Sequence, residues 1–350
     1  MLLPVPFLSA LHTPATLAFW LLILTCQSIV GGLTGALPTI AMQMLAYAQA
    51  GSRRVTGSAL DHQKTLGEGP NKGLKAEINR TFQIVFLVLA GFVIVILSVF
   101  GTALIWASLR RLQSPESGMV MWVIFIAQAA LRLQMQPYVA YLFAVGQTVV
   151  ARRIEALAWT FGGVTAALAL AFGASIVLAF GLLYLPAIAH LLLTRHFAFA
   201  YGWQRECPER REYQGEKLLR QIWPRAWRGT LGLLSGAITI YGAGFLLSQH
   251  GRPSEVAGFL LAINVLGLAQ QVALSPLYAS LPDMALRYAQ GAQEQLFALA
   301  DRAIGRSSWL FVLMVIPIPV AIWIANRIGI SVEFTSSTIW LALASAIFVV

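Results

Sequence analysis

The sequence predicts an all-α protein that crosses a membrane about nine times. Apolar residues make up 58% of its 350 residues and charged residues only 11%, whereas a soluble domain carries about 25% charged residues. Because the bilayer core has no water to bond unpaired backbone groups, only helices or a closed barrel can cross it. The apolar runs have the length of a spanning helix, roughly 20 residues, and are too long for barrel strands.

Nine apolar segments follow one another along the chain. They lie at residues 17–48, 81–108, 118–145, 153–173, 175–194, 229–248, 256–280, 308–326 and 334–350. The first is long enough to span the bilayer and then project into water. The fourth and fifth meet at Gly173, Ala174 and Ser175, which predicts a tight helical hairpin. The ninth reaches Val350 without a polar flank, so we expect the chain to be cut short.

The basic residues alternate between the two sides of the predicted membrane. Of the 24 Lys and Arg residues, 19 fall in the predicted loops of one side and four in those of the other, and the last is Arg132. Loops rich in Lys and Arg are cytoplasmic. Met1 is therefore predicted outside, and we expect one helix to be missing before it. The placement of these basic residues in short loops explains the net charge of +10 as a signal for membrane orientation, and no nucleic-acid partner is expected.

A short motif occurs twice, near the two ends of the chain. Leu-Pro-x-x-Ala begins at Leu37 and again at Leu281, and each copy is followed by Tyr-Ala-Gln, at Tyr47 and at Tyr288. Both copies fall at predicted cytoplasmic helix exits, and repeats of the same orientation imply an even number of helices per unit. We therefore expect two parallel units of six helices, with the copies at helices two and eight and about two helices absent at the end.

A polar stretch at 195–228 separates the two predicted units. It mixes Arg and Glu with Trp203, Trp223 and Trp227, a composition that favours an amphipathic linker at the lipid headgroups. A docking surface for a cytoplasmic partner is the alternative. The predicted domains are an N-terminal helical bundle at 1–194, this linker, and a C-terminal bundle at 229–350, with both bundles incomplete.

Arg132 is the one ionisable residue deep in a predicted helix. Gln128 and Gln136 lie four residues before and after it, on the same helix face. A charge at the bilayer centre costs about 2.5–3.5 kcal/mol on insertion scales, and the predicted helices hold no acidic residue at comparable depth. An anionic ligand in a cavity suits this guanidinium. The alternative is an Arg that reaches the headgroups or bonds to carbonyls of a neighbouring helix.

The seventh segment carries further polar residues on one face. Asn264 and Gln271 share that face, where polar groups either bind helices together or line a cavity, and both roles stay open. The predicted substrate-binding residues are thus Arg132, Gln128, Gln136, Asn264 and Gln271.

The chain carries no recognisable enzyme motif. It has no His-Glu-x-x-His, no zinc-spaced cysteines, no P-loop and no G-x-S-x-G. The predicted outer loops are short, and their carboxylates are limited to Glu116, Glu255 and Glu333. A glycosyltransferase or polymerase in the membrane usually needs a larger outer part. We therefore predict a protein that is not an enzyme and needs neither a cofactor nor a metal.

Three groups of short motifs carry a family resemblance. They lie at 12–14 with 19–20, 31–34 and 47–51, at 141–147 with 150–155, and at 274–278 with 281–282 and 288–291. These stretches resemble the second helix, the junction of helices four and five, and the helix-eight exit of bacterial polysaccharide biosynthesis flippases. That family belongs to the multidrug/oligosaccharidyl-lipid/polysaccharide exporter superfamily.

The resemblance implies two six-helix bundles around a central cavity, which move polyprenyl-pyrophosphate-linked oligosaccharide across the bacterial inner membrane. It implies as partners the lipid-linked oligosaccharide, membrane lipids, and a glycan polymerase or glycosyltransferases of the same pathway. The family usually has twelve to fourteen helices, so this chain departs from it in length. The alternatives are a drug or small-molecule exporter of the same superfamily, a membrane-embedded glycosyltransferase or polymerase, and an inactive flippase remnant.

Overall fold

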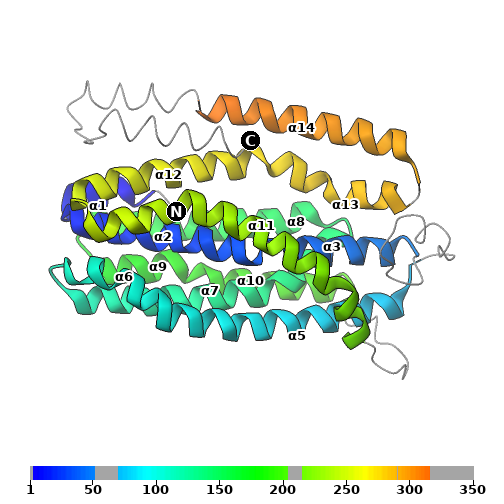
Figure 1. Ribbon diagram of the computed structural model, residues 1–350, viewed down its shortest axis with the longest axis horizontal. Helices are drawn as coiled ribbons and strands as arrows, with labels where there is room; N and C mark the ends of the chain where they lie inside the picture. The colour runs from blue at the N-terminus through cyan, green and yellow to red at the C-terminus, as the bar shows by residue number, and fades with distance from the viewer. Residues whose placement is uncertain (1–2, 52–69, 204–214, 290, 316–350) are drawn as a thin grey trace.

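The computed structural model describes residues 3–51, 70–203, 215–289 and 291–315, and within these ranges all regular structure is helical. The helices are α1 (Val5–Leu11), α2 (Pro14–Thr34), α3 (Ala36–Gln49), α5 (Lys72–Ile96), η1 (Leu97–Gly101), α6 (Thr102–Arg110), α7 (Pro115–Ala144), α8 (Thr148–Ala171), α9 (Ile176–Tyr184), α10 (Pro186–Ala200), α11 (Gly215–His250), α12 (Pro253–Ala273), α13 (Ser275–Ala289) and α14 (Gln293–Val315). They run roughly along one common direction (Figure 1).

Seven helical runs in the described residues are long and apolar enough to cross a membrane. They lie at 14–32, 72–110, 115–144, 148–171, 176–200, 226–250 and 253–273, which matches the first seven predicted segments. The prediction of a helical, multi-pass membrane protein is therefore confirmed. The eighth predicted segment begins in α14 and continues past Val315, and the ninth lies outside the described residues, so the count of nine stays a prediction.

The predicted hairpin between the fourth and fifth segments is present. α8 ends at Ala171, Gly173 adopts a left-handed φ of 75°, and α9 begins after Ser175. A φ in this region suits glycine because it has no Cβ. The Ser175 Oγ accepts a hydrogen bond from the Leu178 amide at 3.3 Å, which caps α9.

Two helix pairs of equal design lie at corresponding places in the chain. α2 and α12 each have 21 residues. Each is followed, after a single residue, by a shorter helix, α3 with 14 residues and α13 with 15. The first motif copy falls in α3 and the second in α13 as far as Ala289, and these shorter helices lie at the same end of the molecule (Figure 1). α2 packs against α12 and α3 packs against α13, so the two pairs are in direct contact.

α2 lies at the centre of the helix packing. All residues from 18 to 27 are buried, and the helix contacts α7, α11 and α12. Gly32 permits the close approach of α11, because a Cβ there would lie 2.8 Å from the Ala237 Cβ and 3.1 Å from the Leu233 carbonyl oxygen. The first spanning helix of the predicted N-terminal bundle is thus packed on the first two helices of the predicted C-terminal bundle.

Arg111 joins α6 to the C-terminal end of α11. Its Nη1 donates to the carbonyls of Ser248 at 3.3 Å and Gly251 at 2.9 Å, and its Nη2 donates to that of Gln249 at 2.8 Å. In return the Gln249 Nε2 donates to the Leu104 carbonyl at 2.7 Å. The last carbonyls of a helix lack intrahelical partners and carry partial negative charge. The guanidinium therefore completes the end of α11 and fixes it on α6.

The predicted linker is partly helical and its tryptophans differ in environment. Trp223 and Trp227 lie on α11 with exposures of 58% and 48%, as a headgroup-facing helix would have them. Trp203 is instead buried, with ring centroids 4.9 Å from Tyr138 and 5.1 Å from Tyr141. Residues 204–214 lie outside the described part, and the lipid contact of the linker stays a prediction.

We expect Gly162→Ala to destabilise the α8–α9 hairpin. A Cβ at this position would lie 2.5 Å from the Leu183 carbonyl oxygen, a backbone atom that cannot rotate away. Overpacking of this kind costs about 1–3 kcal/mol. The measurement is the thermal unfolding midpoint of the protein in detergent. Gly181→Ala is the control, because nothing lies within 4 Å of its added Cβ; an equal loss in both variants would contradict the prediction.

We expect Arg111→Ala to destabilise the protein by about 1–2 kcal/mol, because three carbonyls at the end of α11 lose a charged donor. Arg110→Ala is the matched control. The Arg110 guanidinium lies over the Trp106 ring of its own helix, 5.1 Å from the ring centroid. Chemical denaturation in detergent would compare the two, and a loss in Arg110→Ala as large as in Arg111→Ala would refute the role of the α11 end.

Candidate functional site

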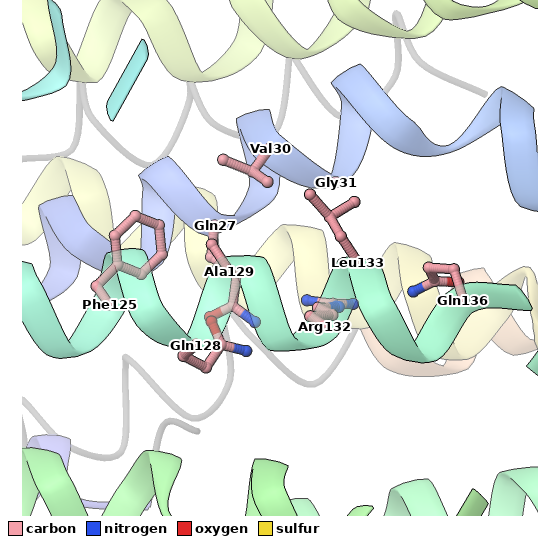
Figure 2. Close-up of a pocket in the computed structure, with 9 residues that line it drawn as sticks. All are labelled: Gln27, Val30, Gly31, Phe125, Gln128, Ala129, Arg132, Leu133 and Gln136. Carbon is pink, nitrogen blue, oxygen red and sulfur yellow. The ribbon is translucent and has the colours of Figure 1, made fainter. Parts of the chain in front are cut away.

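A small cavity lies between α2 and α7 (Figure 2). The residues that line it are Gln27, Val30 and Gly31 from α2, and Phe125, Gln128, Ala129, Arg132, Leu133 and Gln136 from α7. Its volume is about 20 Å³, which is room for about one water molecule. A molecule much larger than water therefore does not fit in this cavity as the structure has it.

Three of the predicted binding residues meet at this cavity. Gln128, Arg132 and Gln136 follow one another along α7 at intervals of one helical turn, and all three line the cavity (Figure 2). Arg132 is partly buried and lies near the middle of α7. In the part of the chain that the structure describes, its guanidinium has no hydrogen-bond or ion-pair partner. A charge so placed is available to a ligand in the cavity.

Gln128 is the most deeply buried of the polar lining residues. Its side chain is 3% exposed, and both its amide oxygen and its amide nitrogen lack a partner among the described residues. An unpaired buried amide costs about 1–3 kcal/mol in proteins. Both groups of the Gln128 amide are therefore available to a polar molecule in the cavity.

The α2 wall contains a polar residue that the sequence analysis did not single out. Gln27 is buried and lines the cavity, and its Oε1 accepts a hydrogen bond from the Tyr184 hydroxyl of α9 at 3.1 Å. Beside it Gly31 has open space where a Cβ would lie, whereas its neighbour Gly32 packs on α11. Its position within an apolar run was the sequence signal that could have identified Gln27 as a candidate. The packing of α2 on α7 was needed to show that it lines the cavity.

Two buried polar residues lie close enough to Arg132 to feel its charge: Tyr184 of α9 and His190 of α10. The cavity itself is lined by α2 and α7 alone among the described residues. Among the described residues no group of three or more His, Cys, Asp or Glu gathers in a way that would hold a metal ion.

The other two predicted binding residues lie elsewhere. The Asn264 Nδ2 donates to the Thr25 Oγ1 at 3.1 Å and to the carbonyls of Leu21 at 3.4 Å and Leu260 at 2.8 Å. Asn264 therefore ties α12 to α2, which is the first of the two roles expected for it. Gln271 is exposed on α12. Neither residue is among those that line the cavity.

The fold and the cavity define the class of protein: a multi-pass helical membrane protein with a polar, positively charged cavity inside its helix packing. Comparisons with protein-family models, with curated proteins and with solved structures found no match for this chain. The resemblance to polysaccharide flippases thus stays a prediction from the sequence motifs.

We expect Gln128→Met to raise the thermal stability of the protein. The substitution removes two unpaired buried polar atoms and keeps a similar side-chain length, so the free energy of unfolding should rise by about 1 kcal/mol. The unfolding midpoint in detergent measures this. Gln134→Met, on the same helix but outside the cavity lining, should change it less. A lower midpoint for Gln128→Met would show that the amide is satisfied in solution.

Proposed function

We propose that the chain is a membrane transporter that flips polyprenyl-pyrophosphate-linked oligosaccharide across the bacterial inner membrane for surface polysaccharide synthesis. The observation that carries the proposal is Arg132, which lies near the middle of a spanning helix, lines a cavity and has no partner among the described residues. The motif resemblance to flippases supports the same substrate class.

The chemistry of the head group explains why the cavity needs Arg132. A pyrophosphate carries at least two negative charges, which cannot enter hydrocarbon without compensation. Guanidinium is always charged, and its planar fork matches phosphate oxygens. Gln128 adds an unpaired amide one turn away, and Gln136 lines the cavity on the far side of Arg132. The cavity offers the head group a path that the bilayer does not.

The small volume of the cavity and the paired helices support alternating access as the mechanism. The cavity must widen to take a head group, and α2 is the wall that stands between α7 on one side and α11 and α12 on the other. A rocking motion that carries α2, α11 and α12 away from α7 would open the cavity first to one side and then to the other. Corresponding helix pairs such as α2–α3 and α12–α13 are typical of transporters built from repeats.

Two features favour this proposal over its alternatives. A drug exporter for cations would need an acidic side chain in the cavity, and none of the nine lining residues is acidic. A membrane-embedded glycosyltransferase or polymerase would need a substantial outer part. The described connections on the predicted outer side are short: 111–114, 172–175 and 251–252.

We expect Arg132→Ala to reduce surface glycan in a flippase-deficient cell by at least about ten-fold relative to the unsubstituted chain, since one charged hydrogen bond contributes about 1.5–3 kcal/mol. Surface glycan per cell would be measured with the amount of inserted protein held equal. Arg132→Lys should fall between the two, because it keeps the charge and loses the fork.

Arg110→Ala, an exposed Arg outside the cavity, is the control and should restore glycan as well as the unsubstituted chain does. Unchanged glycan export in Arg132→Ala would contradict the proposal that the cavity binds the head group. Failure of the unsubstituted chain to restore any glycan would favour the inactive-remnant alternative.

A further inference from the structure

Tyr184, the last residue of α9, is held in place beside Gln27 of the cavity lining. It is 2% exposed, and its ring lies 4.8 Å from that of Phe180 and 6.3 Å from that of Trp159, both edge to face. Its hydroxyl donates to the Gln27 Oε1 at 3.1 Å, a buried contact between residues 157 positions apart. Ring packing of this kind leaves the phenol little freedom, so the hydroxyl defines where the Gln27 oxygen lies.

The hydrogen bond fixes the side on which the Gln27 oxygen lies. A primary amide has an oxygen with two lone pairs and a nitrogen with two N–H donors, and a phenol has one proton to give. In the described structure this proton goes to one lone pair of the Gln27 oxygen. Gln27 lines the cavity, and the tether on its oxygen favours the amide nitrogen, a donor, as the group that an occupant meets.

We propose that Tyr184 is a positioning residue that makes the cavity selective for anions of the phosphate and pyrophosphate class by holding the Gln27 oxygen away from the occupant. The inference rests on the proposed function, in which the occupant is an anionic head group. The inference adds Tyr184, a residue outside the cavity lining, as the one that determines which hydrogen-bonding group Gln27 presents to the occupant.

The two walls then present the same polarity. Arg132 on α7 has five N–H donors and no acceptor, and Gln27 on α2 offers N–H groups. Gln128, whose amide is bonded to nothing among the described residues, can turn its own donor to the same ligand. Phosphate oxygens accept bonds from both walls, whereas a cation or a donor-rich ligand would face unpaired N–H groups and bind poorly.

A purely structural role for Tyr184 makes a different prediction. The same hydrogen bond ties α9 to α2, so Tyr184→Phe lowers stability under either role. A tie between helices would leave ligand preference unchanged. A positioning role changes the affinity for anions, and it does so only while Gln27 is present to be positioned.

The test uses the full chain, purified in detergent, and inorganic pyrophosphate as the probe in titration calorimetry. Tyr184→Phe keeps the ring and removes the hydroxyl, and it should weaken pyrophosphate binding about three- to ten-fold, the loss expected when one donor is no longer held in place. Tyr138→Phe is the matched control, because the Tyr138 hydroxyl accepts from the Gln83 Nε2 at 3.4 Å and lies outside the cavity lining.

A double-mutant cycle identifies the route of the effect. Gln27→Met should weaken pyrophosphate binding as much as Tyr184→Phe does, and adding Tyr184→Phe to Gln27→Met should change it no further, because the two residues act as one unit. Fully additive losses, or wild-type affinity in Tyr184→Phe, would overturn the inference. If Tyr184→Phe does not yield folded protein, wild-type affinity in Gln27→Met alone would overturn it.

The outcome is separable from that of the proposed function. Binding of inorganic pyrophosphate needs neither glycan nor transport, so the Tyr184 effect can be present in a chain that restores no surface glycan. In that case the anion site stands and the flippase function falls. Absence of pyrophosphate binding by the unsubstituted chain would overturn the inference itself.

Discussion

An uncompensated positive charge inside a spanning helix is the constraint around which this protein is arranged. Arg132 has no ion-pair partner in the described residues, and a charge at that depth must face a cavity, a partner or the headgroups. The polar groups that the helices place near Arg132 are neutral: Gln27 from α2, Gln128 and Gln136 from α7, and Tyr184 from α9. A buried carboxylate would have satisfied Arg132 permanently, whereas neutral neighbours leave its charge to a ligand.

α2 has to serve this cavity and the packing of the whole molecule at once. Two adjacent glycines divide the tasks, because Gly31 leaves space at the cavity while Gly32 lets α11 approach within van der Waals distance. Asn264 adds hydrogen bonds from α12 on a third side. Lipid-facing residues gain little from packing in a bilayer, so small residues and side-chain hydrogen bonds are the forces that hold such helices together. Because α2 lines the cavity and also packs on α11 and α12, a shift of α11 or α12 would move one wall of the cavity.

The helical membrane fold could be read from the sequence because it depends on local quantities. Length and apolarity located the first seven segments, and the 3.6-residue period placed Gln128, Arg132 and Gln136 on one face. The rest depends on which helices meet. Gln27 and Tyr184 are distant from Arg132 in the chain and join it only through the packing of α2 and α9. For Asn264, the helical period predicts which face of its helix it lies on but not which helix packs against that face. The sequence therefore could not decide between the contact with Thr25 and a place in the cavity lining.

The contacts that hold these helices together differ in how readily water can replace them. Arg111 binds the end of α11 at an exposed position, where water can replace it at the carbonyls of Gln249 and Gly251. Gly32 instead packs closely on the Ala237 side chain and the Leu233 backbone of α11, and such packing is lost when the helices separate. In the proposed rocking motion α2 and α11 would therefore move together as one unit. The exchangeable contacts would then be those between α11 and α6, at the end of the molecule where α1 and α6 lie (Figure 1).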